Sequence, residues 1–253
     1  MSESLTADVG RQWESASSPD AVSFANVEYT WPGSSPFTLA IADFKLARGE
    51  KLLLLGPSGS GKSTFLSLLA GIVVPGKGKI DVLGTDMARL SGAARDRFRV
   101  EHFGIIFQMF NLLPYGSLID NVLLPLHFSR TRRDRARADG ALDDVAVELL
   151  ATLGIDRTVI ANAKTANLSV GQQQRVAAAR ALIGAPQIIV ADEPTSALDR
   201  NTEGAFLNLL FAQSGAAGAS VIMVSHDESL ARYFDRVVRL DDIAVATRGA
   251  RSQ

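Results

Sequence analysis

Two segments near the start of the chain have apolar and polar residues that nearly alternate. Their apolar positions are Val22, Phe24, Val27 and Tyr29 in the first segment, and Phe37, Leu39 and Ile41 in the second. Such alternation is typical of a strand with one buried face, and Pro32 and Gly33 between the segments favour a turn. The pattern therefore predicts an antiparallel pair of strands.

Three short runs of consecutive apolar residues are typical of strands that are buried on both faces. Residues 51–55 end at Gly56 and lead into helical spacing over residues 63–70. Residues 188–191 and 219–224 each end in polar residues that are followed by helix-like segments. Buried parallel strands that alternate with helices predict an α/β fold around a mostly parallel sheet, with ligand groups at the carboxyl ends of the strands.

The middle of the chain, residues 117–185, shows helical periodicity and no clear strand. We expect a helical subdomain, at about residues 110–166, inserted into a domain that spans residues 21–253. Residues 1–20 are polar and are expected to form a mobile tail. The stretch from Arg130 to Arg137 holds five arginines and one aspartate. It is interpreted as a solvated helix with its lead-in loop, the alternative being a contact with phospholipid or nucleic acid.

Composition narrows the possible functions. The formal net charge of -1 argues against a strongly basic nucleic-acid surface, although a local patch is compatible with it. The absence of cysteine excludes disulfides, thiolate metal sites and a cysteine nucleophile. The apolar runs fall far short of the roughly 18 residues that span a bilayer, and the first residues lack the features of a secretory signal. We therefore expect the chain to stay in the cytoplasm.

A glycine-rich segment follows the first buried run and has the form G-x-x-x-x-G-K-[ST]. Its residues are Gly56, Pro57, Ser58, Gly59, Ser60, Gly61, Lys62, Ser63 and Thr64. Placed between a strand and a helix, such a loop lets backbone N–H groups converge on phosphate oxygens at a helix N-terminus. Lys62 would contact the β- and γ-phosphates, and Ser63 would ligate Mg²⁺. A purely structural glycine turn is the alternative, and the strand and helix on either side argue against it.

Three other predicted strands end in polar residues that complement this loop. Asp192 and Glu193 follow residues 188–191, His226 follows residues 219–224, and Gln108 ends the run that begins at Gly104. Asp192 would hold Mg²⁺, and Glu193 would act as a base or position the attacking water. His226 would contact the γ-phosphate, and Gln108 could sense Mg²⁺ and the water. Taken alone, the acidic pair would be interpreted as a solvated strand end, and the histidine as structural.

Taken together, these segments resemble those of the ATP-binding-cassette (ABC) ATPases over about residues 22–241. In family terms, the phosphate loop is similar to Walker A, Gln108 to the Q-loop, and residues 168–172 to the signature that opens a helix over residues 172–183. Asp192 and Glu193 end a strand similar to Walker B, Asp199 lies in a segment similar to the D-loop, and His226 is similar to the switch histidine. The resemblance implies a P-loop NTPase fold with an antiparallel β subdomain, and the binding of ATP with Mg²⁺.

The resemblance also implies a nucleotide site that is shared between two copies of the chain. Ser169, Gly171 and Gln172 would contact the nucleotide of a partner copy, so a homodimer is expected. Where the family usually has glycine, this chain has Val170, which raises the alternative of a non-hydrolysing module. Trp31 is the expected adenine-stacking residue because it precedes Pro-Gly, and Tyr29 is the second choice.

Within the family, Phe103–Gln108 and Asn111–Pro114 are similar to the lipoprotein-releasing, macrolide-export and cell-division ATPases. That group implies a permease partner with few membrane helices and an extracytoplasmic domain, at the cytoplasmic face of the inner membrane. The main hypothesis is thus an energising subunit of a transporter or mechanotransmission complex, without nucleic acid. The rival is a soluble ABC ATPase acting on nucleic acid or ribosomes, for which two cassettes or a long coiled coil would be expected.

Overall fold

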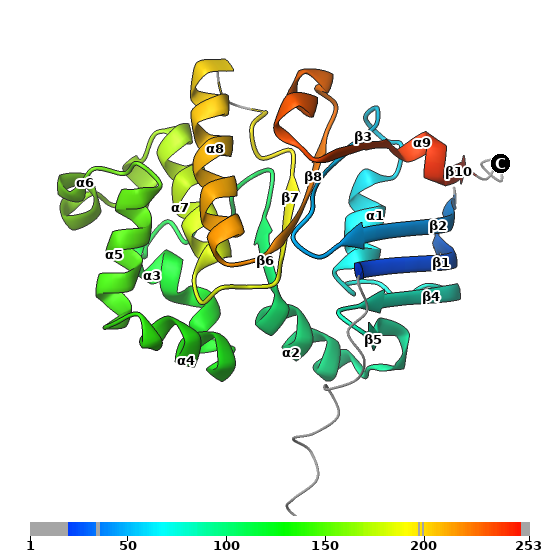
Figure 1. Ribbon diagram of the computed structural model, residues 1–253, viewed down its shortest axis with the longest axis horizontal. Helices are drawn as coiled ribbons and strands as arrows, with labels where there is room; N and C mark the ends of the chain where they lie inside the picture. The colour runs from blue at the N-terminus through cyan, green and yellow to red at the C-terminus, as the bar shows by residue number, and fades with distance from the viewer. Residues whose placement is uncertain (1–19, 34–35, 197, 199, 249–253) are drawn as a thin grey trace, which may run out of the picture.

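Two five-stranded sheets, one parallel and one antiparallel, form the framework of the protein (Figure 1). The structure is a computed structural model, and it describes residues 20–33, 36–196, 198 and 200–248. Residues 1–19, which make up nearly all of the predicted tail, lie outside the described residues. The predicted class, an α/β fold with a parallel core and an antiparallel sheet, is confirmed.

The parallel sheet has the strand order β6-β7-β8-β3-β9, and all of its neighbouring strands are parallel. The strands are β3 (Lys51–Leu55), β6 (Phe103–Ile106), β7 (Ile188–Asp192), β8 (Ser220–Ser225) and β9 (Arg236–Arg239). The three predicted apolar runs form β3, β7 and β8 and are almost wholly buried. Because parallel strands end at one edge of a sheet, the residues after β3, β6, β7 and β8 meet there.

The antiparallel sheet has the strand order β10-β2-β1-β4-β5. Its strands are β1 (Asp20–Trp31), β2 (Phe37–Ala47), β4 (Lys77–Val82), β5 (Thr85–Asp86) and β10 (Ala244–Arg248). The predicted pairing of β1 with β2 is confirmed, with Trp31 opposite Phe37. Helix α1 (Lys62–Leu69) packs on this sheet, since the ring of Phe65 lies 5.1 Å from that of Phe24 and 4.9 Å from that of Phe44.

Helices on the other side of the parallel sheet occupy most of the middle of the chain (Figure 1). They are α3 (Leu118–Leu123), α4 (Arg130–Ala138), α5 (Leu142–Thr152), α6 (Arg157–Asn162), α7 (Val170–Leu182) and α8 (Arg200–Ala216). In contrast, Phe98 of α2 (Gly92–His102) and Leu240 of α9 (Leu240–Ile243) belong to the hydrophobic core on the side of the antiparallel sheet. Short 3₁₀ helices are η1 (Met87–Arg89), η2 (Leu124–His127), η3 (Thr165–Asn167) and η4 (Glu228–Tyr233). The helical character of residues 117–185 is confirmed, whereas the subdomain boundaries at 110 and 166 stay a prediction.

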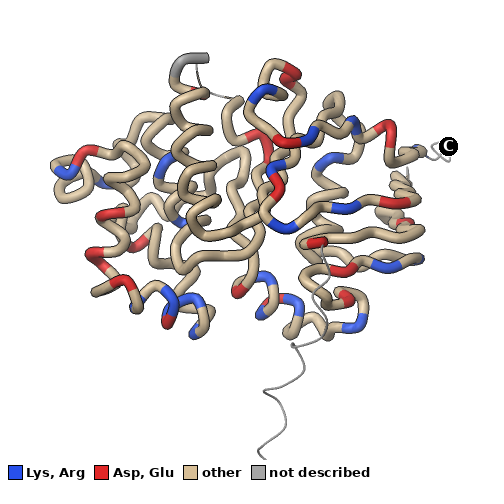
Figure 2. The backbone as a smooth tube through the Cα atoms, in the orientation of Figure 1, with Lys and Arg blue, Asp and Glu red and all other residues tan. Residues whose placement is uncertain are grey.

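No helix in the described ranges combines the length and the apolar character that crossing a bilayer requires. Helices α2 and α4 carry charged residues of both signs along the edge of the molecule (Figure 2). The prediction of a solvated arginine-rich helix is wrong for Arg132, which is 1% exposed. Its guanidinium donates to the carbonyl oxygens of Ala181, Ile183, Val100 and Phe103. Burial lowers the pKa of Arg132 to about 10.

Candidate functional site

The glycine-rich loop joins β3 to α1 in the conformation that its glycines allow. Gly59 has φ 77° and Gly61 has φ 111°, both in the left-handed region that favours glycine. A Cβ atom on Gly61 would lie 3.0 Å from Leu39 Cδ1 and 3.1 Å from Phe37 Cζ. Gly61 is also the N-cap of α1, so the loop ends where the unpaired amides and the positive dipole end of the helix begin.

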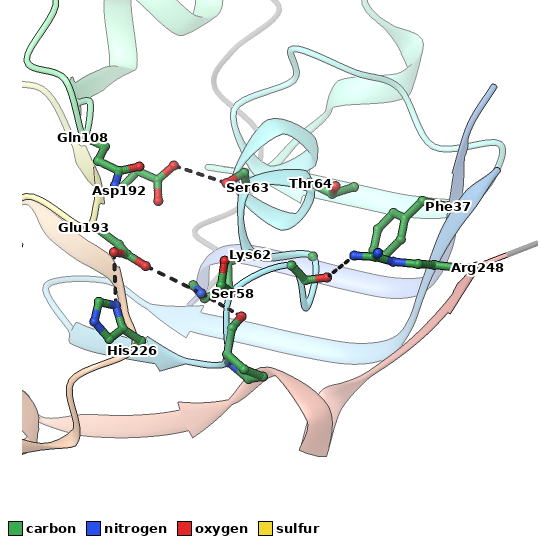
Figure 3. A pocket seen from close by; sticks show the side chains of 13 residues that line it. Phe37, Ser58, Lys62, Ser63, Thr64, Gln108, Asp192, Glu193, His226 and Arg248 are labelled. Carbon is green, nitrogen blue, oxygen red and sulfur yellow. Dashed lines mark hydrogen bonds and ion pairs between the residues drawn. The ribbon is translucent and has the colours of Figure 1, made fainter. Parts of the chain in front are cut away.

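A cavity of about 1040 Å³ opens over this loop (Figure 3). Most of the predicted phosphate-binding and catalytic residues line it: Pro57, Ser58, Gly59, Gly61, Lys62, Ser63, Thr64, Gln108, Asp192, Glu193 and His226. Gly56 and Ser60 belong to the loop without lining the cavity. The four strand ends that the sequence indicated therefore meet at one site.

Lys62 lies at the base of this cavity and is 7% exposed. Its Nζ donates to the carbonyl oxygens of Gly56, at 2.8 Å, and Pro57, at 3.0 Å. The same atom lies 3.6 Å from Glu193 Oε1. Among the described residues, the partners of the ammonium are two loop carbonyls and one carboxylate, and a phosphate can replace them with a stronger, charge-assisted contact.

Asp192 faces the other side of the loop, where the Ser63 hydroxyl lies 3.4 Å from Asp192 Oδ2 (Figure 3). Burial raises the pKa of Asp192, and the negative charge of Glu193 raises it further. Ser63 and Lys62 act in the opposite direction. A carboxyl in this setting gains from a cation, because the cation offsets both causes of its raised pKa.

Glu193 lies between a lysine and a histidine. Its Oε2 is 3.1 Å from His226 Nδ1, and its backbone N–H donates to the carbonyl oxygen of Val224 at 3.0 Å. Its φ is 43°, a conformation that glutamate rarely adopts and that costs about 1–3 kcal/mol. Backbone strain of this kind often occurs at active sites, where it holds a side chain in one position.

The donor set fits Mg²⁺ that is held jointly with phosphate oxygens. Among the described residues, no group of three or more His, Cys, Asp or Glu could hold a metal by itself. Mg²⁺ is commonly bound by one or two protein oxygens together with substrate phosphates and water. Ser63 and Asp192 supply two such oxygens beside Lys62. The Ser60 hydroxyl is buried in the loop without a described partner, so a polar ligand atom would satisfy it.

The predicted adenine-stacking residue lies beside the cavity rather than in its lining. Trp31 Nε1 donates to Thr64 Oγ1 at 3.0 Å, and Thr64 does line the cavity. Trp31 is 40% exposed, and the Tyr29 ring meets it edge-on at 5.2 Å. Both candidates therefore lie next to α1, and the structure leaves the stacking role a prediction.

The predicted signature residues lie at the start of α7, away from the cavity lining. Ser169 is the N-cap of α7 and forms a reciprocal capping box with Gln172. The helix therefore begins at Val170, two residues earlier than predicted. Gly171 has room around it, since the nearest atom to an added Cβ would be Leu198 Cδ2 at 3.8 Å. Asp199 lies outside the described residues.

Val170 fits the backbone that this position requires. It is the first helical residue of α7, it is absent from the residues with positive φ, and it is 45% exposed. No left-handed conformation here demands glycine, so the β-branched side chain adds no backbone strain.

Two residues of the cavity lining were missed by the sequence analysis as functional residues. Phe37 begins β2, and Arg248 ends β10. The Arg248 guanidinium donates to the Gly59 carbonyl at 3.3 Å and lies 5.9 Å from the Phe37 ring centroid. Phe37 could have been found from its predicted pairing near Trp31. For Arg248 the sequence offers no signal, because β10 was not predicted.

Comparisons with known proteins agree with this geometry. Residues 39–196 match the family described as ABC transporter. The chain is 38% identical over 199 residues to the lipoprotein-releasing system ATP-binding protein LolD of Xanthomonas euvesicatoria pv. vesicatoria, covering 79% of this chain and 78% of the relative. It is 40% identical over 200 residues to LolD of Novosphingobium aromaticivorans, and the match covers 79% of this chain and 86% of that relative.

Among solved structures, the chain resembles the dimeric ATP-binding cassette MJ0796 in a post-hydrolysis state bound to ADP and Pi. The TM-score is 0.75 and the sequence identity is 34%, over 86% of this chain and 93% of that one. The family match covers more than half of the chain, and the relatives cover more than two thirds of it. The chain therefore belongs to the ABC transporter family, as an ATP-binding and ATP-hydrolysing subunit.

Proposed function

We propose that the chain hydrolyses Mg-ATP in the cavity over the glycine-rich loop and thereby drives a separate membrane permease. The observation that carries the proposal is the meeting of Lys62, Asp192, Glu193 and His226 around one cavity. Lys62 and the loop amides bind the phosphates. Ser63 and Asp192 would hold Mg²⁺, which would supply positive charge to the phosphates. Glu193 orients or activates the attacking water, with His226 and Gln108 beside it.

Two copies of the chain complete each nucleotide site. Ser169, Gly171 and Gln172 lie at the N-terminus of a 13-residue helix, where unpaired amides and the helix dipole favour an anion. They do not line the cavity of their own chain. A head-to-tail homodimer brings them onto the partner's nucleotide, and the dimeric state of the related cassette MJ0796 supports this arrangement.

An exposed apolar surface next to Gln108 supports a permease partner. Phe107 and Met109, on either side of Gln108 in the chain, are 40% and 80% exposed, and Tyr115, later in the same loop, is 85% exposed. Large exposed apolar side chains that lie close together mark interaction sites. We infer that this surface, with residues 109–114, receives a permease of few membrane helices and an extracytoplasmic domain. Bound to that permease, the chain would lie at the cytoplasmic face of the inner membrane.

The rival function, action on nucleic acid or ribosomes, has little support. Between α1 and β7, where such a cassette would be expected to carry a coiled coil, the longest helix is α7 with 13 residues. The net charge is -1, whereas a nucleic-acid surface is normally basic. Tight, salt-sensitive nucleic-acid binding without any membrane partner would reverse this preference.

The catalytic proposal is tested with Glu193→Gln, which keeps the shape of the side chain and removes its charge. The variant should bind Mg-ATP, form a dimer that is visible by light scattering, and lose turnover. Lys62→Ala is the counterpart, because losing the ammonium should weaken ATP binding itself. Undiminished turnover in Glu193→Gln, or monomers at saturating ATP, would refute the proposal.

The permease proposal is tested at the exposed apolar surface. Affinity purification of the wild-type chain from its native membranes should recover an integral membrane protein with few membrane helices. Met109→Asp and Tyr115→Asp should abolish that recovery while leaving the ATPase of the isolated chain intact. Recovery of ribosomes or nucleic acid in place of a membrane protein would contradict the proposal.

A further inference from the structure

The C-terminal half of helix α7 is buried in the core of the protein. From Val176 to Leu182 each of its residues is buried. Its apolar side chains share one cluster with Leu118 and Leu150 of the helical segment and with Ile189 of the parallel sheet. Ser169 caps the exposed N-terminus of α7, and this end of the helix is expected to contact the partner's nucleotide. A helix packed in this way moves as a rigid unit.

One buried side chain of α7 holds the loop that follows Gln108. Arg180 is 7% exposed, and its guanidinium donates to the Asn111 carbonyl at 2.7 Å and to the Phe110 carbonyl. Phe110 has φ 56° and Asn111 has φ 48°, so two consecutive non-glycine residues lie in the left-handed region. Such a conformation persists only where surrounding contacts impose it.

A second buried side chain of α7 holds the loop that follows β7. Gln174 is fully buried, and its Nε2 donates to the Pro194 carbonyl at 2.8 Å. Pro194 directly follows Glu193, whose φ is 43°. The loops that bring Gln108 and Glu193 to the cavity therefore both contain left-handed residues, and both are hydrogen-bonded to α7 within three residues of that side chain.

Arg180 stabilises this loop conformation in particular, because its acceptors are the backbone carbonyls of Phe110 and Asn111. The ion pairs formed among the described residues include none with Arg180, so its charge is balanced by the carbonyl dipoles. Burial lowers the pKa of Arg180 accordingly. If the loop changed conformation, a buried cation would lose its two acceptors, which is costly.

We propose that α7 is a brace between the two nucleotide sites of the dimer, with Arg180 and Gln174 as positioning residues for Gln108 and Glu193. When the partner's nucleotide engages the N-terminus of α7, the helix sets both loops of its own subunit in their catalytic conformation. This inference rests on the proposed shared-site dimer.

The experiment compares Arg180→Met, Arg180→Lys and Gln174→Met with the wild-type chain. Mg-ATP affinity, measured with a fluorescent ATP analogue, should stay within about twofold, because the phosphate loop is untouched. The kcat of Arg180→Met should fall by about tenfold or more, as expected for losing two charge-assisted hydrogen bonds. Arg180→Lys should recover part of the kcat, since an ammonium can still donate to one carbonyl.

Arg175→Met is the matched control, because it makes the same change on the same helix. The hydrogen bond described for Arg175 goes to the Leu153 carbonyl, at the end of α5, and not to either loop. This variant should lower the melting temperature and leave kcat unchanged. If Arg180→Met and Gln174→Met keep the wild-type kcat, or if Arg175→Met loses as much as they do, the brace is refuted.

A double variant separates positioning from general damage. Because Arg180 would act through Gln108, adding Arg180→Met to Gln108→Ala should reduce kcat much less than it does in the wild-type chain. Full additivity would overturn the inference. If Glu193→Gln failed to dimerise with ATP, the proposed function would fail first, so the two failures are distinguishable.

Discussion

At the scale of a single residue, the strained backbone of Glu193 lowers the stability of the fold but fixes the position of its carboxylate. Its left-handed backbone directs one carboxylate oxygen toward Lys62 and the other toward His226. Both contacts are with groups that are expected to bind phosphate, so an arriving nucleotide competes with the carboxylate for them. Without nucleotide, the Glu193 carboxylate therefore lies between the Lys62 ammonium and the His226 ring, which the substrate is expected to engage.

The raised pKa of Asp192 predicts a pH dependence for metal loading. A raised pKa means that the folded protein keeps this proton at a higher pH than the ordinary carboxyl value of 3.8. As the pH falls, Asp192 should lose its charge at a higher pH than an ordinary carboxyl does, and the advantage of Mg-ATP over metal-free ATP should shrink there. Titration calorimetry with both ligands at each pH measures that ratio. A ratio that stays constant down to pH 3.8 would contradict the role of Asp192.

The adenine-stacking role of Trp31 can be measured from its own fluorescence. The chain has two tryptophans, Trp13 and Trp31, so Trp13→Phe leaves Trp31 as the sole reporter. ATP should quench its emission, and Trp31→Ala should weaken ATP binding by about tenfold to a hundredfold, as for loss of one base-stacking contact. Trp31→Phe should retain most of the affinity. If Tyr29→Ala weakens binding and Trp31→Ala does not, the role belongs to Tyr29.

At the scale of the elements, the buried Arg132 joins α4 to three other segments. Its carbonyl acceptors lie at the end of α7, at the end of α2 and at the start of β6. The C-terminal ends of helices carry partial negative charge, so this site stabilises a cation without a carboxylate. The arrangement secures the helical segment against the sheet.

We expect Arg132→Met to lower the free energy of unfolding by about 3–5 kcal/mol, because it removes a buried charge and leaves its carbonyl acceptors unpaired. Urea unfolding measures the effect. Arg130→Met is the control, since Arg130 lies two residues earlier on α4 and is 88% exposed in an ion pair with Asp134. Equal urea midpoints for the two variants would show that Arg132 does not secure this helix.

The correctly predicted elements are those in which consecutive or alternating apolar residues indicate which positions are buried. Strands β3, β7 and β8 are continuous apolar runs, and β1 and β2 alternate. Strand β9 has arginine at both ends and is a strand because its backbone pairs with β3. The acceptors of Arg132 lie 29 to 51 residues away in the sequence, so no local pattern shows which of five arginines turns inward.

The residues of the nucleotide cavity likewise divide into those that a local sequence pattern indicates and those that only tertiary packing brings there. The phosphate loop and the strand ends carry their chemistry in consecutive residues, and the structure brings them together. Arg248 reaches the cavity only because β10 pairs with β2 at the edge of the antiparallel sheet. The hydrogen bonds of Arg180 and Gln174 depend on tertiary packing in the same way.

On the scale of the whole molecule, Val170 bears on whether the dimer can close. Val170→Gly should change ATP turnover by less than about threefold, because the position is helical and already accepts a side chain. Steady-state ATPase measurement of both proteins checks this, with dimerisation of the Glu193→Gln forms as a second readout. A gain of tenfold or more in Val170→Gly would mean that the valine obstructs the shared site.

The position of β10 has a consequence for how the protein is made. Residues 244–248 supply an outer strand of one sheet and, through Arg248, part of the wall of the cavity. A ribosome must therefore synthesise every strand of both sheets before the pocket is whole. ATP therefore meets the complete cavity wall only after β10 has emerged from the ribosome.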